Sequence, residues 1–206
     1  ADAGCIGICW SNTCPNMPAW GAKDNHIGNN PLILAVPKSD GEHIMVDCAL
    51  SQFSYGKLET TRLAGKKLPV AGGYDEEGRL TTDPAAIERT CRMLPIGYWK
   101  GSGLSILLDM IATVLTNANS VAKIGTFGDE IGLTQIMIAI DPSKFQDASV
   151  TDSIVNAIAA DVMSSEPVEE GGEVRCPGMG EHRSRRDNLE NGIPVAEEKW
   201  NQVLAM

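Results

Sequence analysis

The stretch LPIGYWKGSGLSILLDMIATVL, residues 94–115, organises the rest of the chain. Its second half predicts an amphipathic helix, because apolar residues recur there at spacings of three and four; they are Leu104, Leu107, Leu108, Ile111 and Leu115. Lys100 stands directly before Gly101-Ser102-Gly103. A cation and glycines at a helix N-terminus suit an anion, because the first backbone N–H groups there are unpaired. A surface loop with an ordinary helix cap explains the same residues equally well, so both interpretations stay open.

Short apolar runs on both sides of this helix predict strands. The runs cover residues 5–10, 32–36 and 44–46, and residues 134–140, which we expect to form a buried strand. Helices are expected at 51–64, at 84–92 behind the capping residue Asp83, at 150–163, and after a turn within 191–200. Residues 117–129 are expected to be a connector. Alternating helices and strands define an α/β chain, and no G-x-G-x-x-G follows a strand, so an ordinary Rossmann fingerprint is absent.

The first residues indicate that this sequence begins inside a longer fold. Residues 1–4 are typical of a helix end with a glycine stop, and the strand follows at once. A domain rarely begins inside such a connection. We therefore expect that an N-terminal portion is missing from this sequence.

Composition narrows the class of protein. The chain has 206 residues, of which 43% are hydrophobic, enough for one substantial core. Its net charge of −10 argues against nucleic acid as a partner, because no basic stripe is available to neutralise phosphates. No apolar run approaches the length of a membrane span, and no signal peptide is visible. A reduced, cytoplasmic protein without a membrane partner is therefore expected.

The six cysteines do not predict a metal site. They contain no C-x-x-C pair and no histidine at zinc-ligand spacing. Cys5 and Cys9 lie in an apolar run, where a free cysteine is usually a small core residue. Ligation by Cys5, Cys9 and Cys14 remains the weaker alternative.

The motifs, taken in order, resemble one family. GCIGICWSN, IGNNPLILAVP, MVDCALSQFSYGKL, LPIGYWKGSGLSILLDMIATVL and CPG…NGIPV…W are similar to segments of the malate/L-lactate dehydrogenase family with the non-Rossmann nicotinamide fold. The resemblance implies a mixed-sheet α/β sandwich with a C-terminal arm. It implies a nicotinamide-binding domain over residues 1–165, incomplete at its N-terminal side, and an arm over residues 166–206 that returns to the dimer region.

The resemblance also implies an activity, the NAD(P)H-dependent reduction of a 2-keto acid to a 2-hydroxy acid by a homodimer. A protonated histidine supplies the proton while the nicotinamide supplies the hydride. NADH is favoured over NADPH, since Asp47 near the ribose would repel a 2′-phosphate. Within the family, malate, lactate, ureidoglycolate and a cyclic imino acid remain alternative substrates.

Three segments match the cofactor side of the family. The first is a strand end made of His43, Ile44, Met45, Val46, Asp47, Cys48 and Ala49. The second is the pair Trp99 and Lys100, and the third is the turn Gly178-Met179-Gly180. Relatives often carry Met or Leu at the position of Cys48 and Glu near Met179, so a side-chain contact at Met179 is in doubt. Asp47 has a second interpretation, as the N-cap of a helix beginning near Ala49.

The substrate side matches at fewer positions. Gly28-Asn29-Asn30-Pro31 corresponds to a G-T-N-P motif, with Asn29 in place of the usual Thr, and Tyr55-Gly56 corresponds to a substrate-lining pair. The acid histidine of the family lies upstream of residue 1, and His26, His43 and His182 do not match it. No catalytic residue is therefore expected within these 206 residues. A non-catalytic dinucleotide-binding or oligomerisation module is the alternative from another class.

Overall fold

The structure is a computed structural model that describes residues 1–195 and 197–206. It divides into two compact units. Unit 1 comprises Ala1–Ile6, Ala35–Val46 and Ile140–Met206, and unit 2 comprises Gly7–Leu34 and Asp47–Ala139. The expected boundary between residues 165 and 166 therefore lies inside unit 1.

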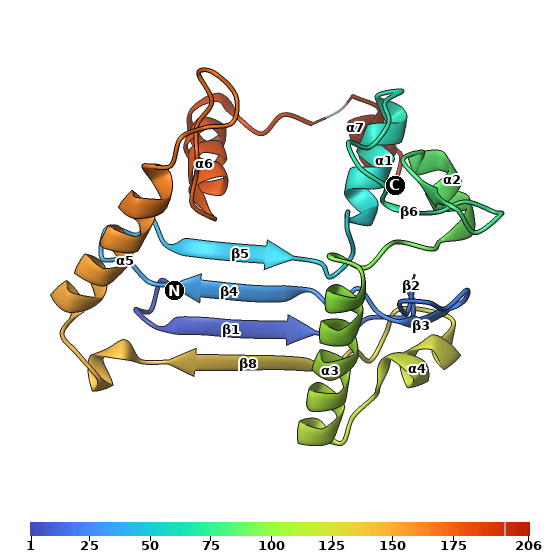
Figure 1. The fold of residues 1–206 in the computed structure, drawn as a ribbon, viewed down its shortest axis with the longest axis horizontal. Helices are drawn as coiled ribbons and strands as arrows, with labels where there is room; N and C mark the ends of the chain where they lie inside the picture. Colours follow the sequence, from blue (N-terminus) through green and yellow to red (C-terminus); the bar gives the residue numbers. More distant parts are fainter. Residues whose placement is uncertain (196) are drawn as a thin grey trace. The chain divides into compact units, whose positions relative to one another are not determined.

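A four-stranded sheet has the order β5-β4-β1-β8, and neighbouring strands run in opposite directions (Figure 1). The strands are β1 (Ile6–Ser11), β4 (Leu32–Val36), β5 (Ile44–Cys48) and β8 (Gln135–Ile140). All four lie where the apolar runs predicted them. The bounds of β4 coincide with the prediction, because Pro31 and Pro37 flank it and proline removes a ladder donor.

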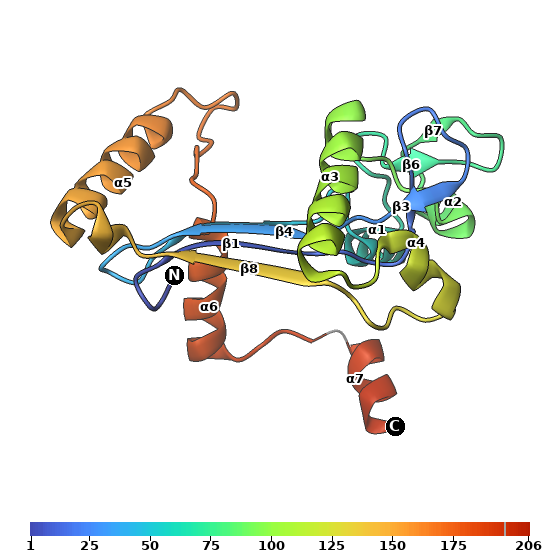
Figure 2. The same cartoon turned by 90° about the horizontal axis from the view of Figure 1, so that it is seen from below.

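Helix α3 (Trp99–Thr116) covers one face of the sheet within unit 2, as Figure 2 shows. Trp10 of β1 donates from its indole N–H to the backbone carbonyl of Leu108 at 3.0 Å. Trp10, Leu108 and Ala112 form one buried cluster with Leu50. Burying a large apolar side chain contributes about 1.5–3 kcal/mol. Of the predicted apolar stripe, however, only Leu108 is buried, because Leu104, Leu107, Ile111 and Leu115 are 40–67% exposed. The buried face of α3 consists instead of Gly101, Ser102, Ser105, Leu108 and Ala112.

A second buried cluster lies beneath two shorter helices of unit 2, α1 (Tyr55–Leu63) and α2 (Pro84–Thr90). The cluster comprises Met17, Ile27, Leu58, Leu68, Ile87 and Met93. The hairpin of β2 (Met17–Pro18) with β3 (Asn25–Ile27) contributes Met17 and Ile27 to this cluster. A second hairpin of unit 2 pairs β6 (Gly73–Tyr74) with β7 (Leu80–Thr81).

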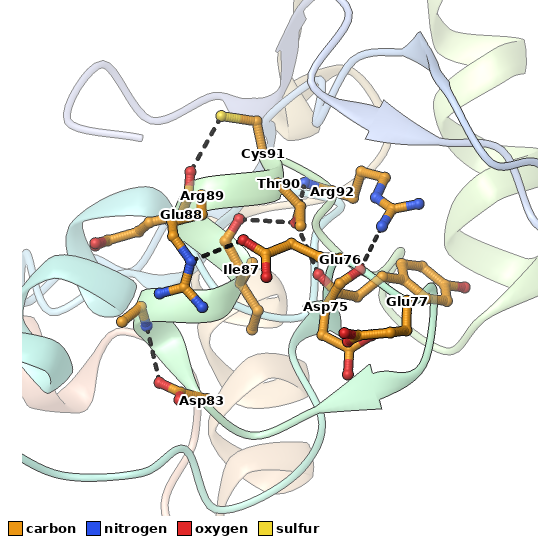
Figure 3. A network of polar contacts seen from close by, with 12 residues as sticks. Asp75, Glu76, Glu77, Asp83, Ile87, Glu88, Arg89, Thr90, Cys91 and Arg92 are labelled. Atoms are coloured by element: carbon orange, nitrogen blue, oxygen red, sulfur yellow. Dashed lines mark hydrogen bonds and ion pairs between the residues drawn. The ribbon is translucent and has the colours of Figure 1, made fainter.

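Polar contacts attach α2 to the β6–β7 hairpin (Figure 3). Asp83 caps the helix by accepting from the Ala85 N–H at 3.1 Å, as the sequence predicted. The Thr90 hydroxyl donates to the Tyr74 carbonyl at 2.7 Å, and the Arg92 guanidinium donates to the Asp75 carbonyl. These contacts fix the two ends of α2 and attach its C-terminal end to the β6–β7 hairpin.

Unit 1 contains three helices besides the one-turn 3₁₀ segment Pro142–Lys144: α5 (Ala148–Met163), α6 (Met179–Asn191) and α7 (Glu197–Leu204). Asp152 of α5 accepts from the Ser39 backbone N–H at 3.0 Å and from its hydroxyl, which fixes the chain after β4 to this helix. The turn-to-helix expected within 191–200 includes residue 196, which lies outside the described residues.

Several expectations were wrong. β8 is not buried, since Met137 is 74% exposed, and Cys5 and Cys9 are only half-buried. Asp47 does not cap α1, because the Ser54 hydroxyl accepts from the Lys57 N–H instead. The connector contains a short helix, α4 (Val121–Ile124), followed by the 3₁₀ turn Gly125–Phe127. Helix α6 was not expected at all.

Among the described residues no single helix is both long and apolar enough to cross a membrane. The pair formed by α3 and Val121–Phe127 passes that test only together, and it is bent by 85°.

Candidate functional site

Three connecting segments of unit 2 lie side by side and carry the expected substrate residues. The Leu50 N–H donates to the Asn29 carbonyl at 2.7 Å, and the Leu50 carbonyl accepts from the Ile96 N–H at 2.8 Å. The Gln52 N–H donates to the Leu94 carbonyl at 2.7 Å. The loop with Asn29, the segment leading to Tyr55 and the segment leading to α3 are therefore held together by the backbone.

The hydrogen bonds at the N-terminus of α3 decide between the two interpretations of Gly101 and Gly103, an anion site and an ordinary helix start. The backbone N–H groups of Lys100, Gly101 and Ser102 already donate to the carbonyls of Gly97, Ile96 and Tyr98. A Cβ atom on Gly101 would lie 2.2 Å from the Ile96 carbonyl oxygen, whereas Gly103 has open space. Gly101 is thus required for packing, and these amides do not form an anion cradle.

The side chains at the same point remain available. Trp99 is 64% exposed, and the Lys100 ammonium lies 5.7 Å from the centroid of its ring. In the part of the chain that the structure describes, Lys100 has no carboxylate partner. Tyr98 stacks edge-on against Trp20 at 5.3 Å between ring centroids and has φ +60°. Trp99 and Lys100 thus present an aromatic face and a free cation.

Unit 1 brings two of the expected cofactor segments into contact. The Met45 N–H donates to the Pro177 carbonyl at 3.3 Å, and the His182 Nε2–H donates to the His43 carbonyl at 2.9 Å. Gly178 has φ +93°, and a Cβ atom there would lie 3.0 Å from the His43 carbonyl oxygen. Only glycine meets both conditions without strain. The turn that precedes α6 is therefore fitted against the beginning of β5.

The residues expected at the cofactor and substrate sites divide between the two units. His43, Ile44, Met45 and Val46 lie in unit 1 with Gly178, Met179 and Gly180, while Asp47, Cys48, Ala49, Trp99, Lys100, Asn29, Tyr55 and Gly56 lie in unit 2. Asp47 is exposed, and Gly180 has open space around it. The Met179 sulfur accepts from the Cys176 N–H at 3.3 Å, so this side chain serves its own turn.

Sequence reasoning missed a polar cluster beside Tyr55. The Glu130 carboxylate accepts from the Cys14 N–H at 3.1 Å. Burial raises the pKa of the Cys14 thiol, and Glu130 raises it further. Burial also raises the pKa of Tyr55 to about 12, with added contributions from the negative charges of Cys91, Cys14 and Glu130. No sequence pattern indicated this cluster, since Cys14 and Glu130 are 116 positions apart.

None of the three histidines is placed as a free acid. The His43 Nδ1 accepts from the Lys38 N–H at 3.0 Å, and its Nε2 faces Asp2 at 2.9 Å. His182 donates to the His43 carbonyl, as described above, and His26 lies 2.8 Å from Asp24 on the surface. The described residues contain no group of three or more His, Cys, Asp and Glu side chains that could hold a metal ion.

A family model described as malate/L-lactate dehydrogenase matches residues 1–204, and the chain belongs to this family. It is 47% identical, over 207 aligned positions, to the 2,3-diketo-L-gulonate reductase of Citrobacter koseri. The match covers all of this chain and 62% of that reductase, so the chain spans less than two thirds of the relative.

Solved structures support the same fold. The sulfolactate dehydrogenase of Methanocaldococcus jannaschii is 28% identical with a TM-score of 0.79, over 98% of this chain and 58% of that one. The malate dehydrogenase of Entamoeba histolytica has a TM-score of 0.89 over 98% of this chain and 60% of that one. At 22% identity, the second comparison speaks for the fold alone.

Proposed function

We propose that this chain is the nicotinamide-binding part of a reductase that converts a 2-keto acid to a 2-hydroxy acid. The observation that carries the proposal is the contact of β5 with the turn before α6, made by the Met45 N–H and the Pro177 carbonyl. Two of the segments that the family resemblance assigns to the cofactor thus meet in space, although they are far apart in sequence. Residues 1–165 would form the cofactor domain and residues 166–206 the C-terminal arm.

The side chains present fit a dinucleotide. Trp99 offers an exposed aromatic ring for a planar ring to stack on, and Lys100, which has no carboxylate partner among the described residues, offers a cation for a phosphate. Asp47 is an exposed carboxylate at the end of β5 and would accept hydrogen bonds from ribose hydroxyls. The same charge disfavours a 2′-phosphate, so NADH is preferred and NADPH is the alternative. The bound cofactor would supply a hydride to the ketone carbon.

The substrate side is proposed to contain Asn29, Tyr55 and Gly56. The Tyr55 phenol is protonated at physiological pH, as an ordinary tyrosine is, and can donate a hydrogen bond; burial raises its pKa further, to about 12. The favoured substrate is 2,3-diketo-L-gulonate, because 2,3-diketo-L-gulonate reductases are 47% identical over the whole chain. Malate, lactate, ureidoglycolate and cyclic imino acids are the alternatives. The acid histidine is proposed to lie outside these 206 residues. The whole protein is proposed to be a cytoplasmic homodimer.

The test uses the protein expressed from its full gene. Its intact mass and N-terminal sequence are determined first, and NADH oxidation is then followed with a panel of 2-keto acids and cyclic imino acids. The fastest turnover is expected with 2,3-diketo-L-gulonate. Binding of NADH without turnover of any panel member would support a non-catalytic module instead. Failure to bind NADH or NADPH would overturn the proposal.

A further inference from the structure

Asn16 and Asn29 form a side-chain amide pair. The Asn16 Nδ2 donates to the Asn29 Oδ1 at 2.8 Å. Asn16 is only 8% exposed, and its own Oδ1 is buried without a hydrogen-bond partner among the described residues. A buried, unpaired carbonyl costs about 1–3 kcal/mol, so this arrangement opposes folding and calls for another explanation.

The loop that carries Asn29 is fixed independently of that pair. Asn30 is fully buried, and its Oδ1 accepts from the Thr13 N–H at 3.1 Å. The Asn30 Nδ2 donates to the Ser105 carbonyl at 3.0 Å, and the Ser105 hydroxyl donates to the Gly28 carbonyl at 2.6 Å. The Asn29 carbonyl itself holds the Leu50 N–H. The backbone is therefore anchored on both sides, and only the Asn29 carboxamide remains to be oriented.

An asparagine side chain has a donor end and an acceptor end, and a neighbour decides which end faces a ligand. Here the Asn16 N–H occupies the Asn29 oxygen. The Asn29 nitrogen, which makes no side-chain hydrogen bond within residues 1–195 and 197–206, is left as the free end. A threonine hydroxyl, the residue expected from the family at this position, both donates and accepts.

We propose that Asn16 is a positioning residue that turns the donor end of Asn29 toward the substrate. Position 29 then binds an acceptor oxygen, either a carboxylate or a ketone oxygen of the 2-keto acid. This inference rests on the proposed function, because it takes Asn29 to lie on the substrate side. It extends that function by identifying Asn16, the residue directly before β2, as a determinant of substrate affinity.

The experiment compares variants of the full-length protein. Asn16→Leu removes the donor with little change in volume, and Asn16→Asp forces Asn29 to donate inward and to present its oxygen outward. We expect KM for 2,3-diketo-L-gulonate to rise about tenfold in Asn16→Leu and further in Asn16→Asp, with kcat nearly unchanged, since one hydrogen bond to a charged group is lost. Calorimetric titration with the 2-hydroxy acid product in the presence of NAD⁺ should weaken in parallel, while NADH affinity stays constant.

Two controls separate positioning from a general structural defect. Asn25→Leu removes a side-chain donor from the same hairpin, one that bonds the Cys91 carbonyl and does not contact Asn29, and it should leave KM unchanged. In an Asn29→Ala background, Asn16→Leu should have no further effect on KM, because position 29 then has no side-chain hydrogen bond for Asn16 to orient.

The outcomes distinguish this inference from the proposed function. Unchanged KM and product affinity in both Asn16 variants, with an active wild type, would overturn the inference alone. An effect of Asn16→Leu that persists undiminished in the Asn29→Ala background would also overturn it. A wild-type protein that reduces and binds no 2-keto acid would overturn the proposed function, and the inference with it.

Discussion

Gly101 and Gly103 stand two residues apart in the first turns of α3, yet alanine should have opposite effects at the two positions. A Cβ atom at Gly101 would lie 2.2 Å from the Ile96 carbonyl oxygen and 2.9 Å from the Ile96 nitrogen. Both are backbone atoms, so no side-chain rotation relieves the overlap. A Cβ atom at Gly103 meets nothing within 4 Å.

The magnitude follows from three contributions. Forcing an extra carbon into a filled space costs about 1–3 kcal/mol. Moving Ile96 away weakens its hydrogen bond with the Gly101 N–H, now 2.9 Å long, at a cost of about 1 kcal/mol. Replacing a helical glycine by alanine contributes about 1 kcal/mol in the other direction. Gly101→Ala should therefore lower the free energy of unfolding by about 2 kcal/mol, and Gly103→Ala should raise it by about 0.5–1 kcal/mol.

Urea unfolding of the two variants, followed by tryptophan fluorescence, measures this difference at constant m. The matched pair also separates packing from anion binding. If the glycines admitted a phosphate to the backbone, both alanine variants would lose NADH affinity while keeping their stability. A Gly101→Ala protein as stable as the wild type would refute the packing argument, as would equal destabilisation at both positions.

Three further predictions concern the two units. Glu130→Gln should lower the raised pKa of the Cys14 thiol, so that alkylation of Cys14, followed by peptide mass spectrometry, reaches the same rate at lower pH; the pKa should stay above its usual value because burial, the larger cause, remains. An unshifted pH profile would contradict this. Gly178→Ala should cost about 1–3 kcal/mol in urea unfolding and weaken NADH binding, because φ is +93° and the new carbon crowds the His43 carbonyl; wild-type stability would show the contact to be unimportant. Asn30→Ala should cost about 2–4 kcal/mol by thermal or urea unfolding, since it removes buried hydrogen bonds at a residue with φ +24°, and a loss under about 1 kcal/mol would contradict the anchoring role.

Local chemistry made part of the fold predictable. The strand at 32–36 is bounded by two prolines, and α2 begins directly after an aspartate, with proline as its first residue. The residues next to each boundary therefore predict it. The helical spacing of apolar residues predicted α3 itself but not its buried face, since of the predicted stripe only Leu108 is buried, where it packs with Ala112 against Trp10.

The candidate site was predictable only in pieces. Resemblance supplied the segments around His43, Trp99 and Gly178, but no sequence signal places Pro177 against Met45 or Asn16 against Asn29. Such contacts depend on the whole path of the chain, as the hydrogen bond between His182 and His43, 139 positions apart, illustrates. The interpretation of Gly101 as part of an anion site, one of the two left open by the sequence, was wrong for a related reason, because the closest neighbour of Gly101 is a backbone carbonyl that only the folded turn brings near.

Helix α6 was not predicted, and strand β8 was predicted to be buried but is exposed. Both errors have one cause. Hydrophobic patterning indicates which faces of a segment avoid water, and it does not indicate whether the backbone of that segment is hydrogen-bonded. Helix α6 has no buried residue and therefore no apolar stripe, and it is held instead by contacts of His182 with His43 and of Arg186 with Glu42. Strand β8 is apolar after Gln135 and was predicted from that pattern, yet it lies at one edge of the sheet with Met137 74% exposed. An exposed apolar edge strand is a template for association, so soluble proteins keep such strands covered. An assembly that covers β8 would make its sequence pattern and its burial agree.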